Sequence, residues 1–247
     1  MEIFKMWKYT KMNVLVVICA AIYAATLIPF KALVLIPGVT EIKPAAALPM
    51  VFGMLFGPAG AWGVAIGNFI ADLSGGTFGI NCIFSFFGNF VLSYIPYKFY
   101  YLLKGSEYYK IKISNKKEVW RFCWILLVST IACGMIIAYG QVVFKILPFY
   151  VLFTIIVIND TIVPIIIGIP LFNLLSPRLT RWGMVWMDIM PMQSKVNKFK
   201  VCLISVLIIL GAAWGVISEF FSITYIMRVI IGGLMVLLLL FACIKSQ

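Results

Sequence analysis

The chain has 247 residues, of which 64% are hydrophobic and 11% are charged, and its mean hydropathy is +1.09. Soluble domains are about 45–50% apolar and about 25% charged, so this composition excludes a soluble globular protein and indicates an integral membrane protein. The net charge is +12. No basic helix is interleaved with aromatic side chains for phosphate contacts, however, which argues against nucleic-acid binding.

Apolar runs of about 17–25 residues predict membrane-spanning helices. We expect helices at residues 13–36, 45–57, 58–75, 82–103, 121–145, 150–175, 201–218 and 223–244. The first follows Lys5, Lys8 and Lys11 as in a signal peptide, but its apolar run outlasts a signal core, so we expect a retained helix. Glycine and proline at Gly57-Pro58 predict a break between two short helices; the alternative is one long kinked helix.

The basic residues test this layout, because cytoplasmic loops are enriched in lysine and arginine. Most of them fall on one side of the membrane, and the exceptions are Lys31, Lys43, Lys145 and Arg228. The pattern predicts an all-α integral membrane protein of about eight transmembrane helices with both termini in the cytoplasm (N-in/C-in). We expect it in the plasma membrane of a prokaryotic cell, as a multi-pass protein.

The chain divides into three parts. Residues 1–176 form a six-helix bundle, residues 177–200 a basic, tryptophan-containing connection at the cytoplasmic interface, and residues 201–247 a C-terminal two-helix hairpin. Tryptophan favours the headgroup level of a bilayer, which is why the connection is expected at the interface. No internal repeat indicates the inverted halves of a secondary transporter.

Few residues suit catalysis or metal binding. Histidine is absent and the cysteines lack the spacing of a metal or redox motif. The glycine series from Gly57 to Gly67 lacks the Gly-Lys-Ser/Thr ending of a phosphate loop, so close helix packing is the better interpretation. We therefore predict that the protein is not an enzyme and holds no metal or cofactor.

Polar side chains within apolar helices are costly in a bilayer and so indicate a function. Asp160 lies deepest; it either lines an outward cavity or pairs with a lysine or caps a helix broken near Pro164. The residues expected to converge in that cavity are Asn68, Asp72, Asn81, Gln141, Asn159 and Asp160. The outer loop at residues 37–44 carries Glu41 and Lys43 between two prolines and forms either a lid or a plain connector.

The first helix carries two pairs of small residues at a spacing of four, Ala20/Ala24 and Ala21/Ala25. Small side chains at this spacing let a second helix approach closely within lipid. The pairs therefore predict a docking face for another membrane protein.

Several motifs between residues 12 and 176 together resemble the substrate-binding S components of energy-coupling factor (ECF) transporters. They are the Ala-x-x-x-Ala face, the polar first outer loop, Phe56-Gly57-Pro58, the helix ending at Asn68-Phe69-Ile70-Ala71-Asp72, Gly88-Asn89-x4-Tyr94-Ile95-Pro96 and Asn159-Asp160-x3-Pro164-x5-Pro170-Leu171. The two C-terminal helices depart from the family's six-helix core.

The resemblance implies a subunit that binds a vitamin or related micronutrient from outside and associates with a transmembrane coupling protein and a pair of ATPases. It places the coupling protein on Ala20, Ala21, Ala24 and Ala25. It places the substrate on Glu41, Lys43, Asn81, Gln141, Asn159 and Asp160. Queuosine precursors, thiamin-like compounds, flavins and cobalamin all stay open as substrates. The alternatives to an S component are a stand-alone proton-coupled secondary transporter and a non-transporting structural or assembly subunit.

Overall fold

The computed structural model describes residues 2–32, 34–36, 40–41, 43–76, 79–104, 112–190, 198–221 and 223–245, without the side chains of residues 31–36, 40–41, 101–104, 198–201 and 244–245. Within these residues the protein is almost entirely helical. Five helices are long and apolar enough to cross a membrane: they lie in Thr10–Phe30, Lys116–Val143, Phe149–Ile189, Cys202–Phe220 and Tyr225–Cys243. The fold is that of a multi-pass membrane protein, as the sequence predicts.

The elements follow one another as a series of helices interrupted by one small β-ribbon. In chain order they are α1 (Glu2–Lys5), η1 (Met6–Lys8), α2 (Thr10–Leu27), η2 (Ile28–Ala32), β1 (Val34–Ile36), β2 (Thr40–Glu41), η3 (Pro44–Ala46), α3 (Ala47–Phe56), α4 (Pro58–Ser74), α5 (Asn81–Lys104), α6 (Lys116–Val143), α7 (Phe149–Val163), η5 (Pro164–Gly168), α8 (Ile169–Arg181), α9 (Trp186–Ile189), α10 (Lys198–Phe220) and α11 (Tyr225–Lys245).

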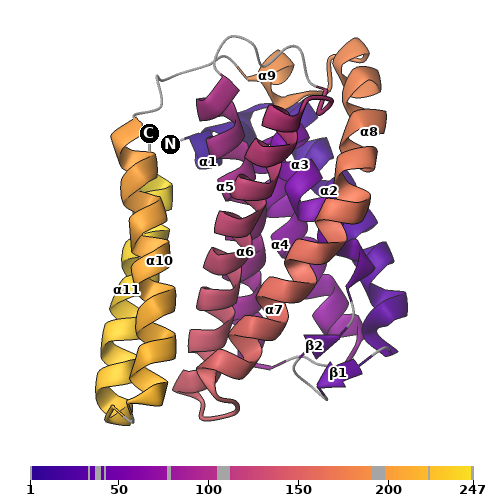
Figure 1. Ribbon diagram of the computed structural model, residues 1–247. Coiled ribbons are helices and arrows are strands. Elements are labelled where there is room, and N and C mark those ends of the chain that lie inside the picture. Colours follow the sequence, from indigo (N-terminus) through magenta and orange to yellow (C-terminus); the bar gives the residue numbers. More distant parts are fainter. Residues whose placement is uncertain are drawn as a thin grey trace.

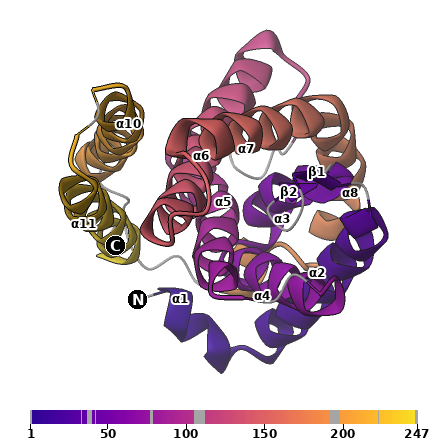
Figure 2. The ribbon, with the colours of Figure 1, turned by 90° about the horizontal axis from the view of Figure 1, so that it is seen from below.

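Seen end-on, α2, α4, α5, α6, α7 and α8 form a ring around α3 and the β-ribbon, and α10 and α11 stand together outside it (Figure 2). The two ends of the chain lie at one end of the bundle, and the β-ribbon and the α10–α11 turn at the other (Figure 1). We call the end with the β-ribbon the outer end and the end with the termini the inner end.

The first outer segment differs from the predicted helix. We expected a helix to residue 36, but α2 ends at Leu27 and a 3-10 turn follows over Ile28–Ala32. Pro29 supplies no backbone N–H, which disfavours a continuing α-helix. Val34 and Ile36 then pair antiparallel with Glu41 and Thr40, and β-branched residues suit this extended backbone. Residues 37–39 and 42 of the predicted lid lie outside the described part.

The predicted break at Gly57-Pro58 is confirmed, and the alternative of one kinked helix is wrong. Gly57 has φ of +59°, which L side chains rarely adopt. Pro58 then occupies the first turn of α4, where no N–H is needed. A Cβ at Gly57 would also lie 2.8 Å from Cγ of Trp186 on α9. Glycine at position 57 therefore allows both the turn between α3 and α4 and the close approach of Trp186 on α9.

The glycines of α4 allow close packing against α2. A Cβ at Gly67 would lie 2.7 Å from the carbonyl oxygen of Ala20, and one at Gly63 would collide with Cys19. The backbones of α2 and α4 therefore lie closer together than larger side chains at these positions would permit. This is the close helix packing predicted for the glycine series.

The predicted sixth helix continues beyond residue 175. The helix starts at Phe149, passes through a π-helical turn at Pro164–Gly168 and reaches Arg181 as α8. Pro164 cannot donate the hydrogen bond of a regular turn, and such positions commonly widen into a π-turn. The side-chain amide of Asn173 then holds the segment after residue 111: its Oδ1 accepts from the Ile113 N–H at 2.7 Å and its Nδ2 donates to the Ile113 carbonyl at 2.9 Å.

The C-terminal hairpin packs on α6 and α7 through glycines. Added Cβ atoms at Gly211 and Gly232 would collide with Met135 and with the ring of Tyr139, respectively. The Tyr139 hydroxyl donates to the Gly211 carbonyl at 3.1 Å. The Tyr225 hydroxyl donates to the carbonyl of Val143, at the end of α6, at 2.7 Å. The predicted hairpin therefore exists and is attached to the bundle by close contacts.

Candidate substrate-binding site and docking face

The deepest polar site is on α7. Asp160 is 5% exposed and Asn159 is half-buried; each has an interaction partner within the chain. At the same level Thr130 of α6 and Thr161 of α7 share a hydrogen bond of 3.1 Å. Asp160 lies eleven residues after Phe149, about 16 Å below the outer end of α7 at 1.5 Å per residue. The site is therefore near mid-membrane, where a charge needs partners.

Lys43 reaches the same region from the outer segment. Cys133, one turn along α6 from Thr130, is buried and experiences the charges of both Asp160 and Lys43. The 3-10 turn that follows Lys43 packs against α7. The charges of Lys43 and Asp160 thus both act on Cys133, and the turn after Lys43 contacts the helix that carries Asp160. Glu41 belongs to β2, but its side chain lies outside the described part.

Gln141 and Asn81 provide unsatisfied acceptors nearer the outer end. Gln141 is 3% exposed, and its Oε1 and the Oδ1 of Asn81 are buried without a hydrogen-bond partner. The two residues are on neighbouring helices, because Gly140 of α6 directly contacts the ring of Phe84, one turn after Asn81 in α5. A buried amide oxygen without a partner costs about 1–3 kcal/mol, so each is suited to receive a ligand donor.

The predicted residues of α4 form a separate, internally satisfied group. Asn68 donates from Nδ2 to Oδ2 of Asp72 at 2.9 Å, and both side chains are buried. Next to them, the hydroxyl of Tyr23 donates to Oδ1 of Asn89 at 3.0 Å, and Asn89 donates to the Ser85 carbonyl at 2.9 Å. The Tyr23–Asn89 bond thus joins α2 to α5, and the Asn68–Asp72 bond lies within α4.

The structure therefore separates the predicted site residues into two groups. One side includes Lys43, Gln141, Asn159 and Asp160, and the other includes Asn68 and Asp72. The sequence analysis did not select Tyr23. The sequence offers little reason to select Tyr23, because a single tyrosine at the outer end of a membrane helix is commonly an interfacial anchor.

The two alanine pairs of α2 face different surroundings. Ala20 and Ala24 are each 5% exposed and lie on the face packed against α4. Ala21 and Ala25 are exposed. Ala20 and Ala24 are thus occupied by packing within this chain, and of the two pairs in the predicted docking face Ala21 and Ala25 are the exposed one.

A groove of about 190 Å³ continues this exposed face toward the inner end. Val14 and Ile18 of α2 form one wall, and Trp182, Met184 and Ile189 of the segment around α9 form the other. Trp182 is 66% exposed. The exposed alanines and the groove form one continuous apolar surface on the outside of the ring.

No group of three or more His, Cys, Asp and Glu side chains that could hold a metal ion occurs among the residues that the structure describes.

Comparison with known proteins gives one match. A family model described as QueT transporter matches residues 14–177. No curated protein and no solved structure matches the chain. The matched range begins within α2, ends within α8 and includes every residue of both polar groups. Since this range is well over half of the chain, the protein belongs to the QueT transporter family, whose members are ECF S components that transport queuosine precursors.

Proposed function

We propose that the protein is the substrate-binding membrane subunit for uptake of a queuosine precursor, driven by a separate coupling protein and ATPase pair. The observation that carries this proposal is the pair of unsatisfied acceptors, Gln141 Oε1 and Asn81 Oδ1, above the Lys43–Asp160 region. The β-ribbon lies over the middle of the ring at this end (Figure 2). A ligand entering from outside would pass it and meet these groups.

The proposed ligand contacts divide by depth. Gln141 and Asn81 accept hydrogen bonds from a polar group near the outer end, and Asp160 orients a donor or cation near mid-membrane. An apolar pocket with a few orienting polar groups is the usual form of a small-molecule site. The Asn68–Asp72 and Tyr23–Asn89 pairs hold the opposite wall in place and bind no ligand in this proposal.

Binding of a queuosine precursor to the purified full-length protein, measured by calorimetry, tests the proposal. Gln141→Met keeps the side-chain length but removes the acceptor, and we expect about threefold to tenfold weaker binding. Asp160→Asn is expected to weaken a cationic ligand by about tenfold or more and a neutral one less. Thr154→Val, on the exposed face of α7, is the matched control and should bind normally.

Unchanged affinity in both Gln141→Met and Asp160→Asn would place the substrate elsewhere. The coupling part of the proposal is tested separately by uptake in cells. Uptake that stops when the ATPases are removed supports it, whereas uptake that survives their loss but stops with a proton uncoupler would identify a secondary transporter.

We further propose that the coupling protein docks on the exposed strip of α2 that carries Val14, Ile18, Ala21 and Ala25. The support is the small size of the two alanines and the apolar groove that continues the strip. A partner helix would approach closely at the alanines and place a larger side chain against Trp182.

A further inference from the structure

A second cavity, of about 140 Å³, lies on the other side of the bundle, where α11 meets α1, α4 and α5. Both views place the end of α11 beside α1 (Figures 1 and 2). The lining of this cavity is entirely apolar. The residues used below are Phe4, Trp62, Phe87, Val91, Leu240 and Cys243.

The cavity extends along the bundle axis. Lys98 of α5 meets Glu2 of α1 at the inner end, and Phe87 lies eleven residues nearer the outer end of α5, about 16 Å away at 1.5 Å per residue. Phe4 is 54% exposed and Phe87 is 43% exposed. The cavity is thus a groove that runs from the inner surface toward mid-membrane and has an exposed phenylalanine at each end.

Water is a poor occupant of this groove. A buried water needs about two to four polar partners, and apolar cavities of about 150 Å³ stay dry and take apolar ligands instead. In a bilayer the molecules that surround the groove are phospholipids, whose acyl chains have the required shape and polarity.

The charges at the inner end indicate which phospholipid fits. Lys5 and Lys8 are exposed on the same short segment as Phe4. That segment carries two lysines and one acid, Glu2, which also pairs with the buried Lys98, so its net charge is positive. Basic clusters next to apolar grooves on the cytoplasmic side favour anionic headgroups.

The hairpin explains why the groove exists. Its closest contacts with the bundle are at glycines in the outer and middle parts of α10 and α11, such as Gly215 against Phe149 and Gly232 against Tyr139. Toward the inner end α11 presents Leu240 and Cys243 instead, and the groove separates them from Trp62. We propose that an anionic phospholipid of the inner leaflet is a bound structural ligand here, with one acyl chain in the groove and its headgroup at Lys5 and Lys8.

The full-length protein, reconstituted with equal amounts of phosphatidylglycerol and phosphatidylcholine of the same acyl chains, tests this by native mass spectrometry. We expect one retained lipid, predominantly phosphatidylglycerol. Cys243→Phe fills part of the groove, so that about two methylene groups of the acyl chain no longer fit. Loss of their burial should lower retention of the lipid about tenfold. Leu237→Phe, on the 63% exposed face of the same helix, is the matched control and should retain the lipid. Lys5→Gln with Lys8→Gln should abolish the headgroup preference.

Photolabelling of the wild-type protein gives a second measurement that does not depend on a variant folding. Phosphatidylglycerol with a diazirine near the end of one acyl chain should label peptides that contain Trp62, Val91 or Leu240. Labelling confined to exposed residues such as Leu237, equal retention by Cys243→Phe and wild type, or no preference between the two headgroups would each overturn the proposal.

Discussion

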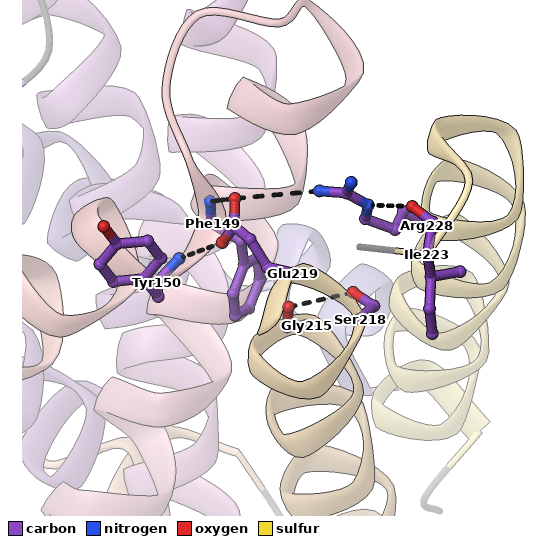
Figure 3. Close-up of polar contacts among 7 residues, drawn as sticks. All are labelled: Phe149, Tyr150, Gly215, Ser218, Glu219, Ile223 and Arg228. Atoms are coloured by element: carbon purple, nitrogen blue, oxygen red, sulfur yellow. Dashed lines mark hydrogen bonds and ion pairs between the residues drawn. The ribbon is translucent and has the colours of Figure 1, made fainter. Parts of the chain in front are cut away.

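Glu219, the last acid of α10, caps the first turn of α7 through Tyr150: its Oε2 accepts from the Tyr150 backbone N–H at 3.0 Å (Figure 3). Its Oε1 accepts from the Phe149 N–H at 3.2 Å. The first N–H groups of a helix have no partner within the helix, and a carboxylate there satisfies them and interacts favourably with the helix dipole. A residue of the C-terminal hairpin thus completes a helix of the family's core.

Removal of this cap should lower stability. Glu219→Ala leaves two backbone donors without their acceptor, and we expect a loss of about 1–2 kcal/mol in the free energy of unfolding, seen as a lower melting temperature in detergent. Arg228 is the control: its Nη1 lies 4.0 Å from Glu219 Oε1 and both side chains are partly exposed, so Arg228→Ala should cost less than about 1 kcal/mol. Equal effects of the two substitutions would contradict the capping role.

Two adjacent glycines of α11 give a matched test of hairpin packing. A Cβ at Gly232 would collide with the Tyr139 ring, whereas one at Gly233 would meet nothing within 4 Å. Gly232→Ala should destabilise the protein by about 1–3 kcal/mol, since Tyr139 must move and its hydrogen bond to Gly211 weakens. Gly233→Ala should leave the melting temperature unchanged or slightly raised. Equal melting temperatures for both variants would show that the hairpin is not tightly docked.

The buried Glu2–Lys98 pair predicts a pH dependence. Burial alone would raise the pKa of Glu2, but the Lys98 ammonium and hydrogen bonds from Lys98 and Tyr97 hold that pKa below its ordinary value of 4.5. The pair therefore contributes stability that is present above pH 4.5 and is lost as the pH falls through the folded-state pKa.

A melting series from pH 7 to pH 3 checks this. The drop in melting temperature below pH 4.5 should be smaller in Glu2→Gln than in wild type. At pH 7, Glu2→Gln should be less stable by about 2–3 kcal/mol, because Lys98 is 5% exposed and stays without its counter-charge. The double variant Glu2→Gln with Lys98→Met should recover much of the loss. A double variant no more stable than the single one would argue against the ion pair.

The alanines of α2 give a test that separates folding from docking. Ala20→Trp should lower expression and melting temperature, because Ala20 is in contact with Gly63 and Gly67 of α4. Ala21→Trp, one residue later and exposed, should leave stability and ligand affinity nearly unchanged but prevent co-purification of the coupling protein. If Ala21→Trp assembles normally with its partner, the docking face is elsewhere.

Much of the helical layout could be predicted because apolar length, glycine and proline are local signals. The break at Gly57 follows from two adjacent residues, and the hairpin from two long apolar runs. The β-ribbon could not be predicted in this way, since Val34 and Ile36 extend an apolar run that reads as helix until their pairing partners are known. The division of the alanine pairs also depends on tertiary structure: both have the same spacing, and only the position of α4 decides which one is buried.

The candidate site shows the same limit. The cost of a buried charge made Asp160 a candidate from sequence alone, and its side chain is indeed buried, whereas the position of Lys43 depends on how the outer segment folds back. Asn68 and Asp72 have the same polarity signal as the ligand-facing candidates. The structure shows that these two residues hydrogen-bond to each other, four residues apart on one helix face, a pairing that the spacing allows but does not require.

The long helix from Phe149 to Arg181 is anchored at both extremities, to Glu219 outside and to the Ile113 segment through Asn173 inside. A rod held in this way cannot slide along its axis without breaking an anchor. Its one irregular turn, at Pro164–Gly168, begins four residues after Asp160. The outer anchor therefore fixes the part of the helix that carries Asp160, and the inner anchor, at Asn173 of α8, fixes the part beyond the irregular turn.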